Sequence, residues 1–134
     1  MFLDTSGLLC YLDEGELQHR RAVELLTRTD DRFLTHSQIL SELVALSLAR
    51  RFSRSITLIF LEEIVDDTDV EVVWVNEHVH REAMKLLNSR QDKTYSLCDA
   101  ISFVLMRQRG ISDALTTDRH FEQEGFIRLL SPVT

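Results

Sequence analysis

The stretch SLCDAISFVLMRQRGISDALTTD, residues 96–118, is the segment of the sequence that best indicates the fold. The apolar residues of its first part recur at helical spacing and share one side of a helix: Leu97, Ile101, Val104 and Leu105. Gly110 follows as a typical helix stop, and SDALTTD then has the pattern of a short strand. The helix spans about 20 Å, and the strand covers roughly the same distance on its way back. We therefore expect the two ends of this stretch, Asp99 and Asp118, to finish on the same edge of the molecule.

Outward from this stretch, short strand-like runs alternate with longer helical patterns along the chain. The runs are FLD at 2–4, RFLTHS at 32–37, VEVVWV at 70–75, SDALTTD at 112–118 and FIRLL at 126–130. Strands separated by helices predict βαβ units and hence a parallel sheet covered by helices on both faces. The expected fold class is α/β, a three-layer α/β/α sandwich around a mostly parallel sheet of four to five strands.

Length and composition predict one globular domain over residues 1–134. The chain is 44% hydrophobic, and Cys10 and Cys98 lack the spacing of a metal motif, which favours reduced thiols. No segment resembles a signal peptide, and no apolar run approaches the roughly 18 residues that a membrane span needs. We expect a cytoplasmic protein that does not bind membranes.

The formal net charge of −7 comes from 22 acidic and 15 basic residues. This balance argues against a protein that holds nucleic acid through bulk positive charge. It does not exclude a nuclease, because acids that are concentrated at one place are offset there by bound cations.

Four acids are expected to meet at one edge of the sheet. Asp4 and Asp118 each end a strand, Asp99 begins a helix, and Glu42 lies about one turn into another helix. The carboxyl ends of parallel strands share one edge, where ligands bind. Glu42 also shares a face of its predicted helix with the apolar residue Ile39, and this predicts that the Glu42 side chain turns inward. Four crowded carboxylates repel one another, and an all-oxygen ligand set suits Mg²⁺ or Mn²⁺.

Each of these acids also has a structural explanation. Ser96 and Asp99 fit a capping box at the start of a helix. Asp4 and Asp118 each precede a predicted helix or helical turn and fit N-caps. Caps alone, however, have no reason to share an edge with an acid inside a helix, and this favours the metal site.

Other polar and aromatic candidates are weaker. Glu42 also fits an ion pair with a base such as Arg51. His78 and His80 point away from each other on the predicted helix, so a zinc site there is not expected. Trp74 lies in a strand-like run and is interpreted as core rather than as a platform for stacking bases.

Four motifs occur in order along nearly the whole chain: LDTS (3–6), SELVA (41–45), SLCDAISF (96–103) and LTTDRHF (115–121). Together they closely resemble the PIN domain, and more narrowly the ribonuclease toxins of VapBC-type toxin–antitoxin systems. Two departures are minor. Asp4 lies very near the start of the sequence, and Cys98 stands where the family more often has a hydroxyl residue.

The resemblance implies a set of functional residues. It assigns Asp4, Glu42, Asp99 and Asp118 to an acidic metal site for Mg²⁺ or Mn²⁺, and Ser6 to a supporting hydroxyl. Arg119 and His120, by position alone, directly follow Asp118 at the rim of the cleft. There they are candidates for contact with the RNA backbone, or else solvent-exposed loop residues.

The implied activity is divalent-metal-dependent cleavage of RNA by an endoribonuclease that is paired with a protein antitoxin. The resemblance also implies a homodimer. Two apolar helical segments of this chain are candidate surfaces for a second copy or for the antitoxin, unless they only pack the core: SELVALSLA (41–49) and SITLIFLEEIV (55–65). The alternatives are a PIN nuclease for RNA processing without an antitoxin, or a non-catalytic receiver-like or RNA-binding module.

Overall fold

A five-stranded parallel sheet forms the centre of the structure, a computed structural model that describes residues 1–28 and 31–132. The strand order is β3-β2-β1-β4-β5, and every neighbouring pair is parallel. The strands are β1 (Phe2–Leu3), β2 (Phe33–His36), β3 (Val70–Val73), β4 (Asp113–Leu115) and β5 (Ile127–Arg128). The predicted α/β class is confirmed, with all five strands parallel.

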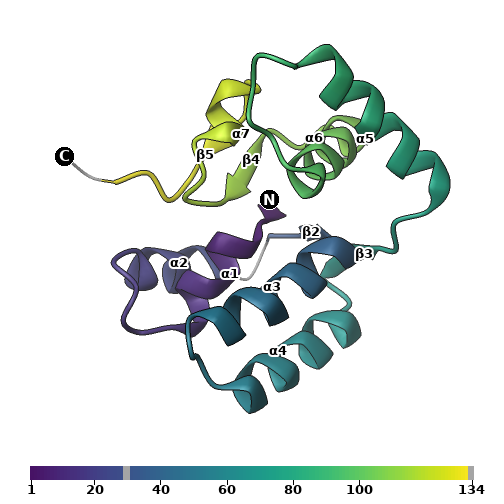
Figure 1. Cartoon of the computed structure of the whole chain (residues 1–134). Helices are drawn as coiled ribbons and strands as arrows, with labels where there is room; N and C mark the ends of the chain where they lie inside the picture. Colours follow the sequence, from purple (N-terminus) through teal and green to yellow (C-terminus); the bar gives the residue numbers. More distant parts are fainter. Residues whose placement is uncertain (29–30, 133–134) are drawn as a thin grey trace.

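Helices cover both faces of the sheet. Helices α1 to α4 lie on one side and α5 to α7 on the other (Figure 1). They are α1 (Thr5–Leu12), α2 (His19–Leu26), α3 (Ser37–Ala49), α4 (Arg54–Asp66), α5 (Glu77–Ser89), α6 (Leu97–Arg109) and α7 (His120–Gln123). None of the helices in the described part of the chain is long and apolar enough to cross a bilayer.

Helix α6 begins and ends as the sequence predicts. Ser96 and Asp99 form the capping box, since the side chain of each accepts a hydrogen bond from the backbone of the other. Gly110 ends the helix in the left-handed conformation, with φ of 65°, which a residue without a side chain adopts at little cost. The chain then returns through β4 towards the edge where α6 began.

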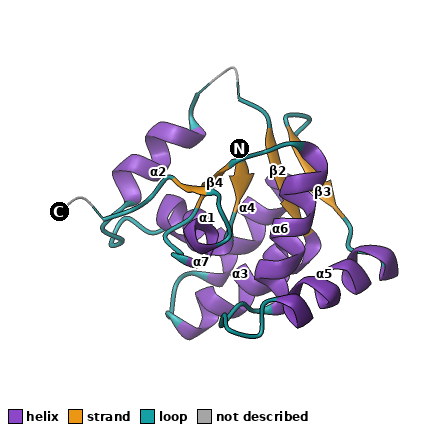
Figure 2. Cartoon of the chain, turned by 90° about the horizontal axis from the view of Figure 1, so that it is seen from above, coloured by secondary structure: helices purple, strands orange, loops and turns teal. Residues whose placement is uncertain are grey.

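The pairing of β1 with β4 fixes the positions of the acids. Phe2 lies opposite Ala114 and Leu3 opposite Leu115, so the residues that follow the two strands are also neighbours. The backbone N–H of Asp4 extends this ladder by donating to Leu115 O at 3.2 Å. Asp4 therefore stands at the carboxyl edge of the sheet, beside the end of β4. Figure 2 shows the strands of this sheet from above.

Helix α1 turns back immediately after β1 and packs tightly against β4. A Cβ atom at Gly7 would lie 1.9 Å from Leu115 O, which no side chain tolerates. Glycine at this position is therefore a condition for the close approach of α1 to the sheet.

The third strand differs from its prediction. The run 70–75 was expected to be covered on both faces, with Trp74 in the core, but β3 ends at Val73 and Trp74 is 63% exposed. The physical reason is that β3 is an edge strand, hydrogen-bonded to β2 alone, so its apolar pattern reflects only partial burial.

Candidate metal centre

Asp4 is buried where β1 meets α1. Its Oδ2 atom accepts hydrogen bonds from Thr116 Oγ1 at 2.6 Å and from Ser6 Oγ at 3.1 Å. The side chain makes no capping bond to α1, so the N-cap explanation for this carboxylate is wrong. Burial is the main cause that raises the pKa of Asp4 to about 7. The hydrogen bonds from Thr116 and Ser6 oppose this rise, and the charges of Asp99 and Asp118 contribute to it.

Two hydroxyl groups connect the ends of β1 and β4. Ser6 Oγ lies 3.1 Å from Thr116 Oγ1 and accepts a hydrogen bond from Thr117 N at 3.0 Å. Thr116 Oγ1 in turn accepts one from Asp118 N at 2.9 Å. Ser6 lies where the supporting hydroxyl was expected. Thr116 was missed by sequence reasoning, although its place in the LTTD motif was the available signal.

Asp99 combines a capping role with a place among the acids. Its Oδ2 atom accepts from Ser96 N at 3.0 Å and also lies 3.1 Å from His120 Nδ1. Burial raises the pKa of Asp99; the hydrogen bond from the Ser96 backbone opposes this, and the Asp118 charge adds to it. The cap and the metal site are therefore compatible uses of one carboxylate.

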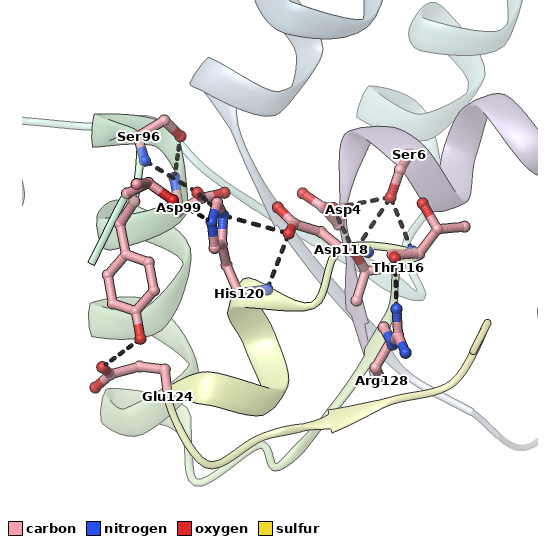
Figure 3. A network of polar contacts seen from close by, with 12 residues as sticks. Asp4, Ser6, Ser96, Asp99, Thr116, Asp118, His120, Glu124 and Arg128 are labelled. Atoms are coloured by element: carbon pink, nitrogen blue, oxygen red, sulfur yellow. Dashed lines mark hydrogen bonds and ion pairs between the residues drawn. The ribbon is translucent and has the colours of Figure 1, made fainter. Parts of the chain in front are cut away.

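Asp118 and His120 complete the cluster (Figure 3). Asp118 Oδ1 accepts a hydrogen bond from His120 N at 2.9 Å and lies 3.3 Å from His120 Nδ1. One potential ligand atom from each of Asp99, Asp118 and His120 lies within 4.8 Å of the other two. His120, expected at an exposed rim, is half-buried and turned towards the acids, whereas Arg119 is exposed.

Glu42 lies at the margin of the cluster. It was expected to turn inward, but its side chain is exposed, because the buried side of α3 carries Ile39 and Leu43 and leaves Glu42 on the flank. It remains close to the acids through Cys98, the residue before Asp99. Burial raises the pKa of the Cys98 thiol, and the neighbouring Glu42 carboxylate raises it further.

The structural alternatives for the remaining candidates can also be compared with the structure. Among the described residues, Glu42 forms no ion pair with Arg51. His78 and His80 are exposed on α5, and neither belongs to a group of potential metal ligands in the described ranges.

The donor set fits a divalent cation. Each of the three aspartates uses one oxygen, Oδ2 of Asp4 and Asp99 and Oδ1 of Asp118, for hydrogen bonds within the described chain. The other oxygen of each carboxylate accepts none from the described residues. Three partly desolvated acids with one imidazole between them carry an excess of negative charge, which a cation relieves.

Known proteins are similar to this chain over nearly all of its sequence. No family model matches the chain. The sequence is 29% identical over 129 residues to the 23S rRNA-specific endonuclease VapC20 of Mycobacterium tuberculosis, covering 96% of this chain and 97% of that protein. It is 28% identical over 122 residues to the ribonuclease VapC26 of the same organism, covering 90% and 89%.

The fold has a solved counterpart. The crystal structure of M. tuberculosis VapC20, described as a sarcin-ricin loop cleaving toxin, superposes with a TM-score of 0.84 at 28% sequence identity. The match covers 94% of this chain and 95% of that one. The structural similarity therefore extends over nearly the whole chain.

Proposed function

This chain is a homologue of the VapC-type PIN-domain ribonuclease toxins over nearly its full length, and we propose that Asp4, Asp99 and Asp118 form the metal site at which it hydrolyses RNA. By that homology it is an endoribonuclease. The observation that carries the proposal is the convergence of Asp99, Asp118 and His120, whose potential ligand atoms lie within 4.8 Å of one another, beside the buried carboxylate of Asp4. Acids held so close together, with one oxygen each left for a ligand, are suited to bind a cation rather than to stabilise the fold.

We propose Mg²⁺ or Mn²⁺ as the ion. When bound, such an ion supplies a nucleophile at neutral pH and offsets the charge that develops on the phosphodiester. The chain's own contribution is positioning: Ser6 and Thr116 fix one oxygen of Asp4, and the backbone of Ser96 fixes one oxygen of Asp99. These hydrogen bonds hold the carboxylates in place before an ion arrives, which lowers the cost of binding it.

Glu42 and Arg119 have roles at the mouth of the same site. Glu42 is exposed beside Cys98. We propose that its carboxylate either binds the ion or orients the attacking water. Arg119 is exposed directly after Asp118 and forms no ion pair with a described acid, so its guanidinium is available to an RNA phosphate. We propose Arg119 as an RNA contact.

Ribosomal RNA is the substrate class that we propose first. The relative VapC20 is named for 23S rRNA and for the sarcin-ricin loop, and the chain matches it along 97% of its sequence. A folded loop with splayed bases presents the backbone that a metal nuclease attacks.

We further propose a homodimer and a cognate antitoxin as protein partners. Exposed apolar side chains gather on α3 and α4, among them Leu48, Ile56 and Ile59 at 66%, 50% and 58% exposure. Apolar groups that are left on one face of a helical pair favour burial against another protein. Light scattering of the chain alone, and again with the product of the adjacent gene, measures both associations.

RNA cleavage by the purified chain tests the function. We expect ribosomal RNA to be cut with Mn²⁺ or Mg²⁺ and to stay intact with a chelator. The Asp118→Asn variant should abolish cleavage and keep the melting temperature close to that of the parent chain. Asp113→Asn is the matched control, because Asp113 is at the amino end of β4, whereas Asp118 follows its carboxyl end, and the variant should leave cleavage unchanged. Full activity of the Asp118→Asn variant would end the proposal.

A further inference from the structure

The imidazole of His120 is held with one ring nitrogen facing the acids. Nδ1 lies 3.1 Å from Asp99 Oδ2 and 3.3 Å from Asp118 Oδ1. The other nitrogen, Nε2, lies 2.9 Å from Thr94 Oγ1, outside the cluster. Without an ion, Nδ1–H donates to the carboxylates and Nε2 accepts from the Thr94 hydroxyl. In the other neutral tautomer, Nε2–H donates to Thr94 Oγ1 and the lone pair of Nδ1 faces the acids, where a cation takes the place of the proton.

The ring is fixed by more than this hydrogen bond. Tyr95 packs edge-on against His120 with ring centroids 5.3 Å apart. The Tyr95 hydroxyl donates to buried Glu124 Oε1 at 3.1 Å, and Glu124 is itself paired with Arg90 and Arg107. The backbone N–H of His120 is also bonded to Asp118. His120 therefore has little freedom to turn away from the acids.

This arrangement has the features of a metal-bound histidine. Such a residue normally offers one nitrogen to the ion and donates the other ring N–H to an oxygen that sets the tautomer and orientation. Thr94 supplies that oxygen here. Nδ1 belongs to the same cluster as the Asp99 and Asp118 oxygens, all within 4.8 Å of one another.

We infer that His120 Nδ1 is a ligand of the metal site, so that the site has a mixed oxygen and nitrogen donor set and takes a divalent transition-metal ion in preference to Mg²⁺. The inference rests on the proposed function for the existence of the site and adds one ligand and a choice of ion. Imidazole nitrogen suits transition metals, whereas Mg²⁺ prefers sites made of oxygen alone. A site made only of Asp4, Asp99 and Asp118 would have no nitrogen ligand to favour a transition-metal ion over Mg²⁺.

A different role for His120 predicts different observations. If the imidazole only balances the charge of the acids, a bound ion replaces it and leaves no bond to nitrogen. Removal of the ring then strengthens metal binding or leaves it unchanged. The two roles are thus separated by whether nitrogen is bonded to the ion.

The test uses Mn²⁺ bound to the full chain, observed by pulsed electron paramagnetic resonance. We expect a ¹⁴N coupling of a directly bound imidazole in the parent chain, replaced by the ¹⁵N pattern when the chain is made with ¹⁵N-labelled histidine. The coupling should vanish in His120→Asn, which places an amide oxygen near the position of Nδ1. His19→Gln is the matched control, since His19 is another half-buried histidine whose Nδ1 bonds Cys10 O at 2.8 Å, and it should keep the coupling.

Metal affinities give a second measurement without reference to catalysis. By calorimetry, we expect His120→Asn to weaken Mn²⁺ binding by about tenfold or more and to change Mg²⁺ binding much less. Thr94→Val should weaken Mn²⁺ binding in the same direction, and Thr94→Ser, which keeps the hydroxyl, should restore it.

The outcomes separate this inference from the proposed function. Mn²⁺ bound to the parent chain without nitrogen coupling, or with coupling that persists in His120→Asn, overturns the histidine ligand and leaves the acidic site standing. No binding of Mn²⁺ at millimolar concentration overturns both. The labelled parent chain by itself shows whether a histidine nitrogen is bonded to the ion, and this spectrum does not depend on the folding of any variant.

Discussion

Thr116 Oγ1 donates a 2.6 Å hydrogen bond to Asp4 Oδ2, across 112 positions of sequence. The bond exists because β1 and β4 pair in register and their next residues stand side by side. It stabilises the charged form of a carboxylate that burial would otherwise keep neutral. A hydrogen bond to a charged group contributes about 1.5–3 kcal/mol, so the loss of this hydroxyl should be measurable.

The first prediction concerns that hydroxyl. Thr116→Val keeps the shape of the side chain and should raise the pKa of Asp4 above its value of about 7. Carboxyl NMR titration of the metal-free chain measures the shift, and RNA cleavage at neutral pH should fall with it. Thr116→Ser keeps the hydroxyl and should behave like the parent chain; an unchanged Asp4 titration in Thr116→Val contradicts the assignment.

The second prediction concerns the stability cost of Asp4. Its pKa is about 7 in the folded chain and near 3.8 when unfolded, so the folded state binds more protons between these values. Stability of the metal-free chain should therefore fall as pH rises from about 4 to about 7. Asp4→Asn removes this loss. It should be more stable than the parent at pH 8, on the order of a few kcal/mol, and should equal it near pH 3.

Urea unfolding with a chelator present measures this difference. Added Mn²⁺ should stabilise the parent chain and have little effect on Asp4→Asn, which should also fail to cut RNA. If Asp4→Asn is less stable than the parent at pH 8, the charge of Asp4 does not destabilise the fold.

The third prediction concerns His36, which is fully buried at the end of β2. Its effect on stability changes with pH in the opposite direction to that of Asp4. Burial lowers the pKa of His36 from 6.5 to about 3, and Nε2 lies 2.9 Å from Ser102 Oγ. The folded chain keeps this imidazole neutral, while the unfolded chain takes up a proton below pH 6.5. As the pH is lowered below 6.5, the free energy of unfolding should therefore decrease by about 1.4 kcal/mol per pH unit.

The contribution of His36 is best measured in the Asp4→Asn chain, where the opposing effect of Asp4 is absent. His36→Gln keeps an amide donor for Ser102 and cannot titrate. Between pH 7 and 5, urea unfolding should show a smaller pH dependence in His36→Gln than in the chain that retains the histidine. Equal slopes would show that His36 is protonated in the folded state.

The fourth prediction concerns the packing of α1 on β4. Gly7→Ala places a Cβ atom 1.9 Å from Leu115 O, so the helix must move away from the strand. We expect a loss of about 3 kcal/mol or more of stability. Gly15→Ala is the control, because the nearest atom to its Cβ is Asp13 Oδ1 at 3.2 Å, the end of a movable side chain. Thermal unfolding of both variants tests the difference, and equal melting temperatures would contradict it.

The edge at which the acids meet could be predicted because it depends on the order of elements alone. Strands that alternate with helices give a parallel sheet, and an acid directly after such a strand lies at its carboxyl end. Asp4 and Asp118 satisfy this condition. Asp99 could be placed because the helix and the strand of residues 96–118 have matching lengths.

The orientation of single side chains could not be predicted in the same way. Glu42 lies on the flank of α3, and a shift of about one residue around a helix separates buried from exposed. Trp74 is exposed because β3 is an edge strand, and sequence gives the strand but not its place in the sheet. The inward turn of His120 depends on Thr94 and Tyr95, which lie far from it along the chain.

The pairing of β1 with β4 also sets when the acidic centre can first form during synthesis. Asp4 is synthesised more than a hundred residues before its partners Thr116 and Asp118. A nascent chain lacking β4 therefore holds an incomplete centre, whatever helices it has already formed. The centre is therefore completed only after the chain has been synthesised through Asp118.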